Sequence, residues 1–209
     1  MEEQSLIGTP AEGGHRGIKM VIRPLSPALC EDWLEYFDHL AFADHKDWAL
    51  CYCLEGHLDQ KTQDCLTDPQ ERRQKAVELI QAGSMQGYLA YLEDKVVGWC
   101  NVNDRENYLY LTEMFRNIGY QPEEPKAGKV KSIFCFLIAP QYRGQGIAQR
   151  LLDRVCQDAA RDGYAWLEAY PFADKSFEFQ YHGTSGMYER CGFAEAADLK
   201  YVKVMRKEL

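Results

Sequence analysis

One stretch near the middle of the chain, residues 132–162, restricts the fold more than any other. It contains seven consecutive apolar residues, Ile133 to Ala139, and a run of this kind is typical of a strand covered on both faces. Pro140 ends the strand because proline has no N–H group to donate to a neighbouring strand. After a short turn, an apolar stripe with helical spacing predicts an amphipathic helix: Ala148, Leu151, Leu152, Val155 and Ala159.

The turn between this strand and this helix, residues 143–148, has the features of an anion site. Gly144 and Gly146 carry no Cβ, so the backbone can approach a ligand closely. The first turn of the following helix directs unpaired N–H groups and the positive end of its dipole to the same place. The spacing disfavours a Gly-x-Gly-x-x-Gly dinucleotide site, and no Gly-Lys-Ser/Thr follows, which excludes a Walker loop. We therefore expect a different phosphate-bearing ligand.

Residues Arg143-x-x-Gly146-x-Ala148 resemble the (Arg/Gln)-x-x-Gly-x-(Gly/Ala) signature of the GNAT superfamily of N-acetyltransferases, in which this loop binds the pyrophosphate of acetyl-coenzyme A. The alternative is a surface turn before an ordinary helix, but the apolar strand and the long helix are the contexts that the motif needs. The resemblance implies acetyl-CoA as the cofactor, with Arg150 or Arg154 near its 3′-phosphate. It also implies a set of cofactor-binding residues: Leu137, Ile138, Arg143, Gly144, Gln145, Gly146, Ile147 and Ala148.

The other predicted elements follow an order that is similar to the acetyltransferase fold. Asp68 and Pro69 are a typical helix start, Gly83 is a typical stop, and Glu93-Asp94 joins two strands as a hairpin. We expect a strand at 18–24, helices at 27–40 and 69–82, helix plus loop at 44–58, strands at 87–92, 95–103 and 164–170, a loop at 171–183, a short helix at 184–191 and a final pair of strands that ends at Val204.

The fold class that the resemblance implies is α/β (α+β), a single GNAT-like domain with helices on both faces of a mixed, mostly antiparallel sheet. Strands four and five, at 132–139 and 164–170, are expected to be parallel and to splay apart around the cofactor. We expect this domain to span 18–209, after a flexible N-terminal tail at 1–17. Residues 104–129 are long for a connection and contain two prolines, which predicts an insertion or flexible loop near the substrate.

Charge and the distribution of apolar residues indicate which partners and which compartment to expect. The net charge of −8 argues against general nucleic-acid binding, which needs a basic face. No apolar run approaches the roughly 18 residues that cross a membrane. The N-terminus has no apolar core segment of the secretory kind, so we expect a cytoplasmic protein. A homodimer is an expectation that rests on the family resemblance alone.

The cysteines are expected to be free thiols. Several of the eight lie inside apolar stretches, where thiols pack as small hydrophobic groups. The stretch that contains His45, Cys51, Cys53, His57 and Cys65 suggests a metal site, but its spacing matches no zinc template. We expect no metal there and interpret the stretch as a packing segment. By resemblance, Trp48 and Tyr52 would line the acceptor pocket.

Two residues are predicted to be catalytic. Tyr188, in Met-Tyr-Glu-Arg-Cys-Gly-Phe, resembles the tyrosine of a family segment Tyr-x-x-x-Gly-Phe that protonates the coenzyme sulfur; the alternative is a packing role. Glu168 shares a strand face with Trp166 and Tyr170, and aromatic surroundings would raise its pKa toward that of a general base. The alternative for Glu168 is a solvent-facing carboxylate. The bases that remain open are Glu113, Asp104 and His182.

The resulting hypothesis is an acetyl-CoA-dependent N-acetyltransferase that acts on a primary amine by direct attack in a ternary complex. An acyl-enzyme is disfavoured because Cys135 lies within an apolar strand with nothing to activate it. The acceptor is a small molecule or a peptide that the sequence leaves unidentified. The alternative function is a non-catalytic acyl-CoA-binding regulatory module. The two would share the phosphate loop and differ at Tyr188 and in the acceptor pocket.

Overall fold

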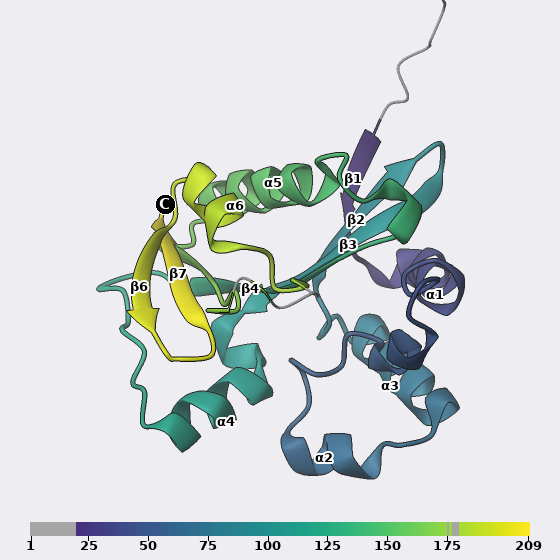
Figure 1. Cartoon of the computed structure of the whole chain (residues 1–209), viewed down its shortest axis with the longest axis horizontal. Coiled ribbons are helices and arrows are strands. Elements are labelled where there is room, and N and C mark those ends of the chain that lie inside the picture. The colour runs from purple at the N-terminus through teal and green to yellow at the C-terminus, as the bar shows by residue number, and fades with distance from the viewer. Residues whose placement is uncertain (1–19, 175, 177–179) are drawn as a thin grey trace, which may run out of the picture.

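The fold is built on one seven-stranded sheet with helices on both faces (Figure 1). The computed structural model describes residues 20–174, 176 and 180–209. The strand order is β1-β2-β3-β4-β5-β7-β6, and every neighbouring pair is antiparallel except β4 and β5, which are parallel. The expected fold class is therefore confirmed. The strands are β1 (Met20–Pro24), β2 (Gly87–Leu92), β3 (Lys95–Asp104), β4 (Val130–Ile138), β5 (Trp166–Ala169), β6 (Ala194–Asp198) and β7 (Lys203–Glu208).

The α-helices divide between the two faces of the sheet, with α5 and α6 on one face and α1, α3 and α4 on the other (Figure 1). The α-helices are α1 (Cys30–His39), α2 (Gln60–Cys65), α3 (Pro69–Gln81), α4 (Leu109–Ile118), α5 (Ile147–Arg161) and α6 (Ser185–Arg190). Four short 3-10 helices join them: η1 (Pro27–Leu29), η2 (Lys46–Cys51), η3 (Arg105–Asn107) and η4 (Pro140–Tyr142).

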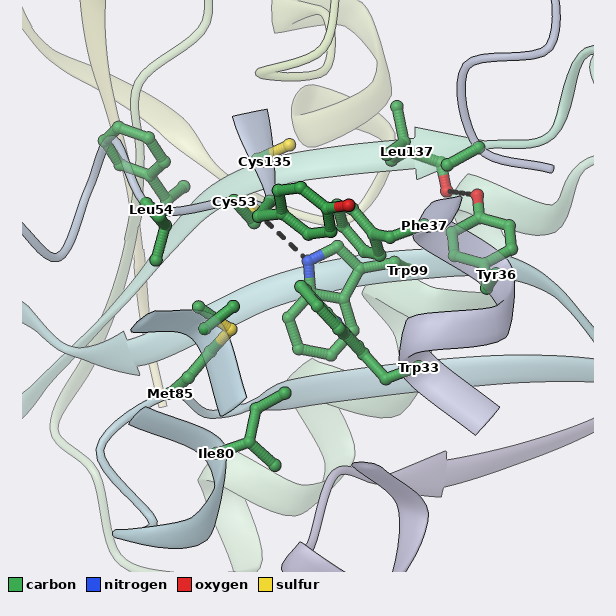
Figure 2. Close-up of a cluster of buried hydrophobic side chains, with 14 of the residues drawn as sticks. Trp33, Tyr36, Phe37, Cys53, Leu54, Ile80, Met85, Trp99, Cys135 and Leu137 are labelled. Atoms are coloured by element: carbon green, nitrogen blue, oxygen red, sulfur yellow. Dashed lines mark hydrogen bonds between the residues drawn. The ribbon is translucent and has the colours of Figure 1, made fainter. Parts of the chain in front are cut away.

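The central strands feed two hydrophobic cores because their side chains alternate between the faces. Leu89, Tyr91 and Trp99 enter the core beneath α1, whereas Tyr88 and Val97 enter the core beneath α5. Figure 2 shows the α1 side, where the indole of Trp99 meets Trp33 edge-on at 6.1 Å between ring centroids. Such edge-to-face pairs add to the stabilisation that comes from burying the rings.

Local sequence signals placed several elements correctly. The Asp68 carboxylate accepts hydrogen bonds from the N–H groups of Gln70 and Glu71, so it caps α3 as predicted. Glu93 and Asp94 both take positive φ angles, 48° and 64°, which the two-residue turn between β2 and β3 requires.

Three expectations differ from the structure. Residues 104–129, expected as an insertion or loop, contain η3 and the helix α4, whose Leu111 and Phe115 are buried one turn apart. The helix expected within 44–58 is only the 3-10 segment η2, and α2 follows it unpredicted. The last strand continues beyond Val204 to Glu208, because β7 pairs with both β5 and β6.

The expected flexible tail, 1–17, lies outside the described residues. Within the described part of the chain, none of the helices has the length and apolar character needed to cross a bilayer.

Candidate active site

The parallel strands β4 and β5 separate partway along their length. Their pairing covers Val130 to Ile133 of β4 opposite β5, and β4 then continues to Ile138 without β5 beside it. The segment 180–183 takes over part of the exposed edge, where the N–H of Phe136 donates to the carbonyl of Tyr181 at 2.6 Å. Because backbone directions alternate along a strand, Ile138 directs its N–H toward the same edge, beyond that bond. The splayed arrangement expected from the sequence is therefore present.

The glycine turn leads directly from this strand into α5. Gly144 and Gly146 have φ angles of 73° and 77°, and Gly146 is the residue that precedes the helix. A Cβ on either glycine would meet no protein atom within 4 Å, so packing does not require glycine there. The backbone conformation does, since side-chain-bearing residues rarely adopt a positive φ. The first N–H groups of α5 have no partner within the helix, and an anion at the helix start would satisfy them.

Arg143 links the glycine turn to a distant part of the chain. Its Nε donates to the carbonyl of Ile138 at 3.1 Å, and its Nη1 lies 2.5 Å from a carboxylate oxygen of Asp44. The other arginines expected near the cofactor lie further along α5. Arg154 donates to Asp158 at 2.8 Å and to the carbonyl of Ile22, so it stabilises the helix against the first strand. Arg150 is exposed to solvent.

A cavity of about 700 Å³ extends from the glycine turn to the segment around η2. The splayed strand β4 and the segment from 180 to 187 form one side, and the chain from α1 to α3 forms the other. Trp48, expected at the acceptor pocket, lies on its wall, whereas Tyr52 is buried behind it and donates to Asp38. The lining residues are Phe37, Phe42, His45, Trp48, Leu50, Cys51, Cys53, Glu55, Arg72, Cys135, Phe136, Leu137, Ile138, Arg143, Ala148, Gln180, Tyr181, Gly183, Thr184 and Met187.

Glu55 is the single carboxylate among the described residues that line this cavity. Burial raises the pKa of the Glu55 carboxyl above its usual value, and the charge of Arg72 opposes that rise. Arg72 donates instead to the backbone carbonyls of Leu50, Cys51 and Leu66. Sequence reasoning missed Glu55, because it lies in a segment without a motif and is brought to the cavity by the fold alone.

Tyr188 lies on α6, behind the cavity wall. Its side chain is fully buried, and its hydroxyl donates to the carbonyl of His182 at 2.8 Å. Burial raises the pKa of Tyr188 well above its usual value, so the hydroxyl stays protonated at neutral pH. Gly183, Thr184 and Met187, its neighbours in the chain, line the cavity. The phenol is therefore separated from the cavity by one layer of its own segment.

Glu168 has a different environment from the one expected. It shares a face with Tyr170, as the strand period predicts, and the Tyr170 hydroxyl donates to it at 3.1 Å. However, its fully buried carboxylate also binds Arg105 Nη1 at 3.2 Å and Arg206 Nε at 3.0 Å. The carboxylate is thus held in a network of ion pairs, and Glu168 does not line the 700 Å³ cavity. Through Arg105, Glu168 ties the segment that leads into α4 to the sheet.

The other candidate bases also lie away from the cavity lining. Asp104 binds Lys129 at 3.0 Å and the Tyr164 hydroxyl at 2.6 Å, and Glu113 accepts from the N–H of Gln60. Burial lowers the pKa of His182 to about 4, so its ring is neutral, and its Nδ1 is hydrogen-bonded to the carbonyl of Phe134. None of these groups is placed to meet a ligand in the cavity.

The thiols of the η2 segment pack against the core of the sheet. Cys53 Sγ accepts hydrogen bonds from Trp99 Nε1 at 3.3 Å and Asn101 Nδ2 at 3.1 Å, and Figure 2 shows the first of these. Every cysteine of the chain is free. Within residues 20–174, 176 and 180–209, no group of His, Cys, Asp or Glu is arranged to hold a metal ion.

These features coincide with a match to a known family. A model of the acetyltransferase (GNAT) family matches residues 27–193, which is most of the chain. The chain therefore belongs to the GNAT family, whose typical acetyl donor is acetyl-CoA. The family expectation drawn from the glycine turn is confirmed. Among the curated proteins compared with it, none matches the chain.

Solved structures support the fold. The PaiA N-acetyltransferase from Thermoplasma acidophilum, in complex with coenzyme A, is 15% identical, with a TM-score of 0.54 over 92% of this chain and 100% of that chain. A GNAT acetyltransferase from Streptococcus pneumoniae is 16% identical, with a TM-score of 0.50 over 91% of this chain and 99% of that chain. The ribosomal-protein-alanine N-acetyltransferase from Brucella melitensis is 18% identical, with a TM-score of 0.51 over 90% of this chain and 99% of that chain. At these identities the likeness establishes the fold alone.

Proposed function

We propose that the protein is an acetyl-CoA-dependent N-acetyltransferase that transfers the acetyl group directly to a primary amine in a ternary complex. The observation that carries this function is the continuous cavity. Arg143 and Ala148 of the helix start and the free strand edge line one end, and the half-buried carboxylate of Glu55 lines the other. A module that only bound acyl-CoA would need the first end and not the second.

The residues present fit the cofactor. The positive φ angles of Gly144 and Gly146 would leave the helix start open to the pyrophosphate, and the N–H groups of Ile147 and Ala148, at the start of α5, would bind it. The N–H of Ile138 on the free edge would hold the pantetheine arm. Leu137 also lines the cavity. Its carbonyl already accepts a hydrogen bond from the Tyr36 hydroxyl at 2.7 Å (Figure 2), so this carbonyl is not assigned to the cofactor. Bound acetyl-CoA supplies an acetyl group activated as a thioester.

Tyr188 is the proposed proton donor to the departing sulfur. A buried phenol holds its proton at neutral pH, as this role requires. For this role its hydroxyl would have to exchange the His182 carbonyl for the sulfur, which requires a movement of the 182–184 segment. Glu168 is not carried forward as the base, because Arg105 and Arg206 hold its carboxylate outside the cavity.

The test measures acetylated product by mass spectrometry with acetyl-CoA and a panel of amines, and measures CoA affinity by calorimetry. We expect product from the wild type. Tyr188→Phe should keep CoA affinity within about twofold and lower kcat by about 10²-fold or more. CoA binding without transfer to any amine would favour the non-catalytic module. Full activity of Tyr188→Phe would overturn the role of the tyrosine alone.

A further inference from the structure

We propose that the acceptor is a compact primary amine with an apolar or aromatic body and no carboxylate, and that Glu55 binds its ammonium group and removes its proton. This inference rests on the proposed acetyltransfer and specifies its second substrate. It follows from the one carboxylate of the cavity, from the walls around it, and from the state of the cavity's arginines.

Glu55 is held firmly in place by its backbone. Its carbonyl oxygen accepts a hydrogen bond from Gln63 Nε2 at 3.0 Å, and the preceding Leu54 is fully buried. The following Gly56 lies so close to Tyr108 that a Cβ there would come within 2.8 Å of the ring. The position of Glu55 on the cavity wall is thus fixed by contacts on both sides in the sequence.

The carboxylate itself lacks a partner. Within the described residues, no hydrogen bond or ion pair reaches its oxygens, because the nearest guanidinium, that of Arg72, donates to three backbone carbonyls. A carboxylate that is largely removed from water and left unpaired is unfavourable. An ammonium group in the cavity would relieve that cost, and it would favour the ionised form of the carboxyl. Glu55 is therefore the position at which a cation gains most.

The apolar residues that line the cavity select the body of the amine. Phe37, Phe42, Trp48 and Leu50 provide aromatic and aliphatic surface on the same side of the cavity. Aromatic faces attract a cation as well as burying apolar carbon. A ligand that combines a single ammonium with a hydrocarbon or ring body matches both properties of this half.

The cationic side chains of the cavity are already engaged, which disfavours acceptors with a carboxylate. Arg143 is paired with Asp44, and Arg72 is bound to carbonyl oxygens. His45 lies 3.7 Å from the same Asp44 and stacks on Trp48. A substrate carboxylate would therefore lose its water without gaining a free cation, and would be repelled by Glu55. Free amino acids are poor acceptors on this reasoning.

The chemistry balances with these groups. As the C–N bond forms and the thioester C–S bond breaks, the nitrogen loses two protons. Glu55 takes the first and passes it to solvent, and the second leaves to solvent through the open side of the cavity. Tyr188 gives a proton to the sulfur and regains one from solvent. The sum is one amide, one thiol and one released proton.

The pH dependence of proton removal by Glu55 depends on which of the groups around it are charged. These groups come from the helices α3 and α4, from the 180–184 segment and from the segment of Glu55 itself: Arg72, Tyr110, Tyr181, Cys51 and Cys53. Burial raises the pKa values of Tyr110, Tyr181 and Cys51, so these three groups are neutral at pH 7, whereas the hydrogen bond with Cys135 lowers the pKa of the buried Cys53 thiol. The acid limb of the rate profile should therefore follow Glu55, and rate should fall as pH drops through its pKa.

The experiment compares 2-phenylethylamine with phenylalanine, which has the same body and an added carboxylate. We expect kcat/KM for phenylalanine to be at least 100-fold lower. Glu55→Gln should lower kcat/KM for the amine at least 100-fold and remove the acid limb of its pH profile, with CoA affinity unchanged. The matched control is Glu71→Gln, because Glu71 is exposed in the first turn of α3 and does not line the cavity.

Calorimetry with 2-phenylethylamine in the presence of CoA separates this inference from the proposed function. Binding to the wild type that is lost in Glu55→Gln supports the acceptor site, even where no product forms and the transfer function fails. Product formation at wild-type rates by Glu55→Gln overturns the inference while acetyltransfer stands. Phenylalanine as the better acceptor, or no amine binding to the CoA complex, overturns it as well.

Discussion

Two glycines of α5 allow the cofactor contact to be separated from backbone strain. Gly146 precedes the helix with φ 77°, and Gly163 follows it with φ 78°. A Cβ on either would meet no protein atom within 4 Å. Alanine at each position should therefore cost the same, about 1–2 kcal/mol of unfolding free energy, because it forces a side-chain-bearing residue into the left-handed region. The helix that separates the two sites is about 22 Å long.

Only Gly146→Ala should weaken CoA binding. Under the proposed function, its methyl group would occupy the space in which the N–H groups of the first turn would meet the pyrophosphate. Losing one such charged hydrogen bond costs about 1.5–3 kcal/mol, which corresponds to a rise of about 10- to 150-fold in Kd. Calorimetric titration with CoA gives the affinity, and urea denaturation gives the stability of each variant.

The comparison with Gly163→Ala makes the result decisive. Equal loss of stability with an affinity loss confined to Gly146→Ala would support the placement of the pyrophosphate at the helix start. Wild-type affinity in Gly146→Ala, or an equal loss of affinity in both variants, would refute it.

Two further predictions concern buried charge. Glu168→Gln removes the carboxylate that Arg105 and Arg206 share but leaves each its second partner, Glu124 or Glu123, so urea denaturation should show a loss of about 1.5–3 kcal/mol, and a loss below about 0.5 kcal/mol would contradict the ion-pair role. Burial lowers the pKa of both His57 and His182 from 6.5 to about 4, so the unfolded chain binds more protons between these values and stability falls as pH drops below 6.5. Unfolding at pH 5 should show a loss of about 2 kcal/mol per histidine relative to pH 7. Replacing His57 or His182 with glutamine should reduce the dependence of stability on pH. An unchanged pH dependence would contradict the assignment to that histidine.

The strand, turn and helix of residues 132–162 could be predicted because their signals are local. An apolar run, a proline and two glycines each act within a few residues, and the structure places β4, η4 and α5 accordingly. The helix α4 was missed although its signals were present: Leu111 and Phe115 have helical spacing, and Gly119 ends the helix in the left-handed region. The two prolines that follow the helix favour a loop, and they led to the expectation of a loop over the whole segment.

The site residues were harder to predict because distant parts of the chain determine their roles. The face shared by Glu168 and Tyr170 followed from the strand period, but Arg105 and Arg206 approach Glu168 from 63 and 38 residues away. Shortly before Glu55 the chain bends at Tyr52 and Cys53, whose φ angles are positive, 39° and 48°. No glycine stands there that would have predicted the bend. Only the assembled fold brings the Glu55 carboxylate to the cavity.

The ion pair between Arg143 and Asp44 connects the two ends of the cavity. Arg143 belongs to the turn before α5, and Asp44 lies between Phe42 and His45, which line the opposite wall. Under the proposed function, a phosphate that drew the guanidinium toward itself would loosen its hold on Asp44 and hence on that wall. By thermodynamic reciprocity, an amine that shifted the wall would then change the affinity for the donor by the same factor. This exposed salt bridge would thereby couple the binding of the two substrates, and the coupling would weaken as ionic strength rises.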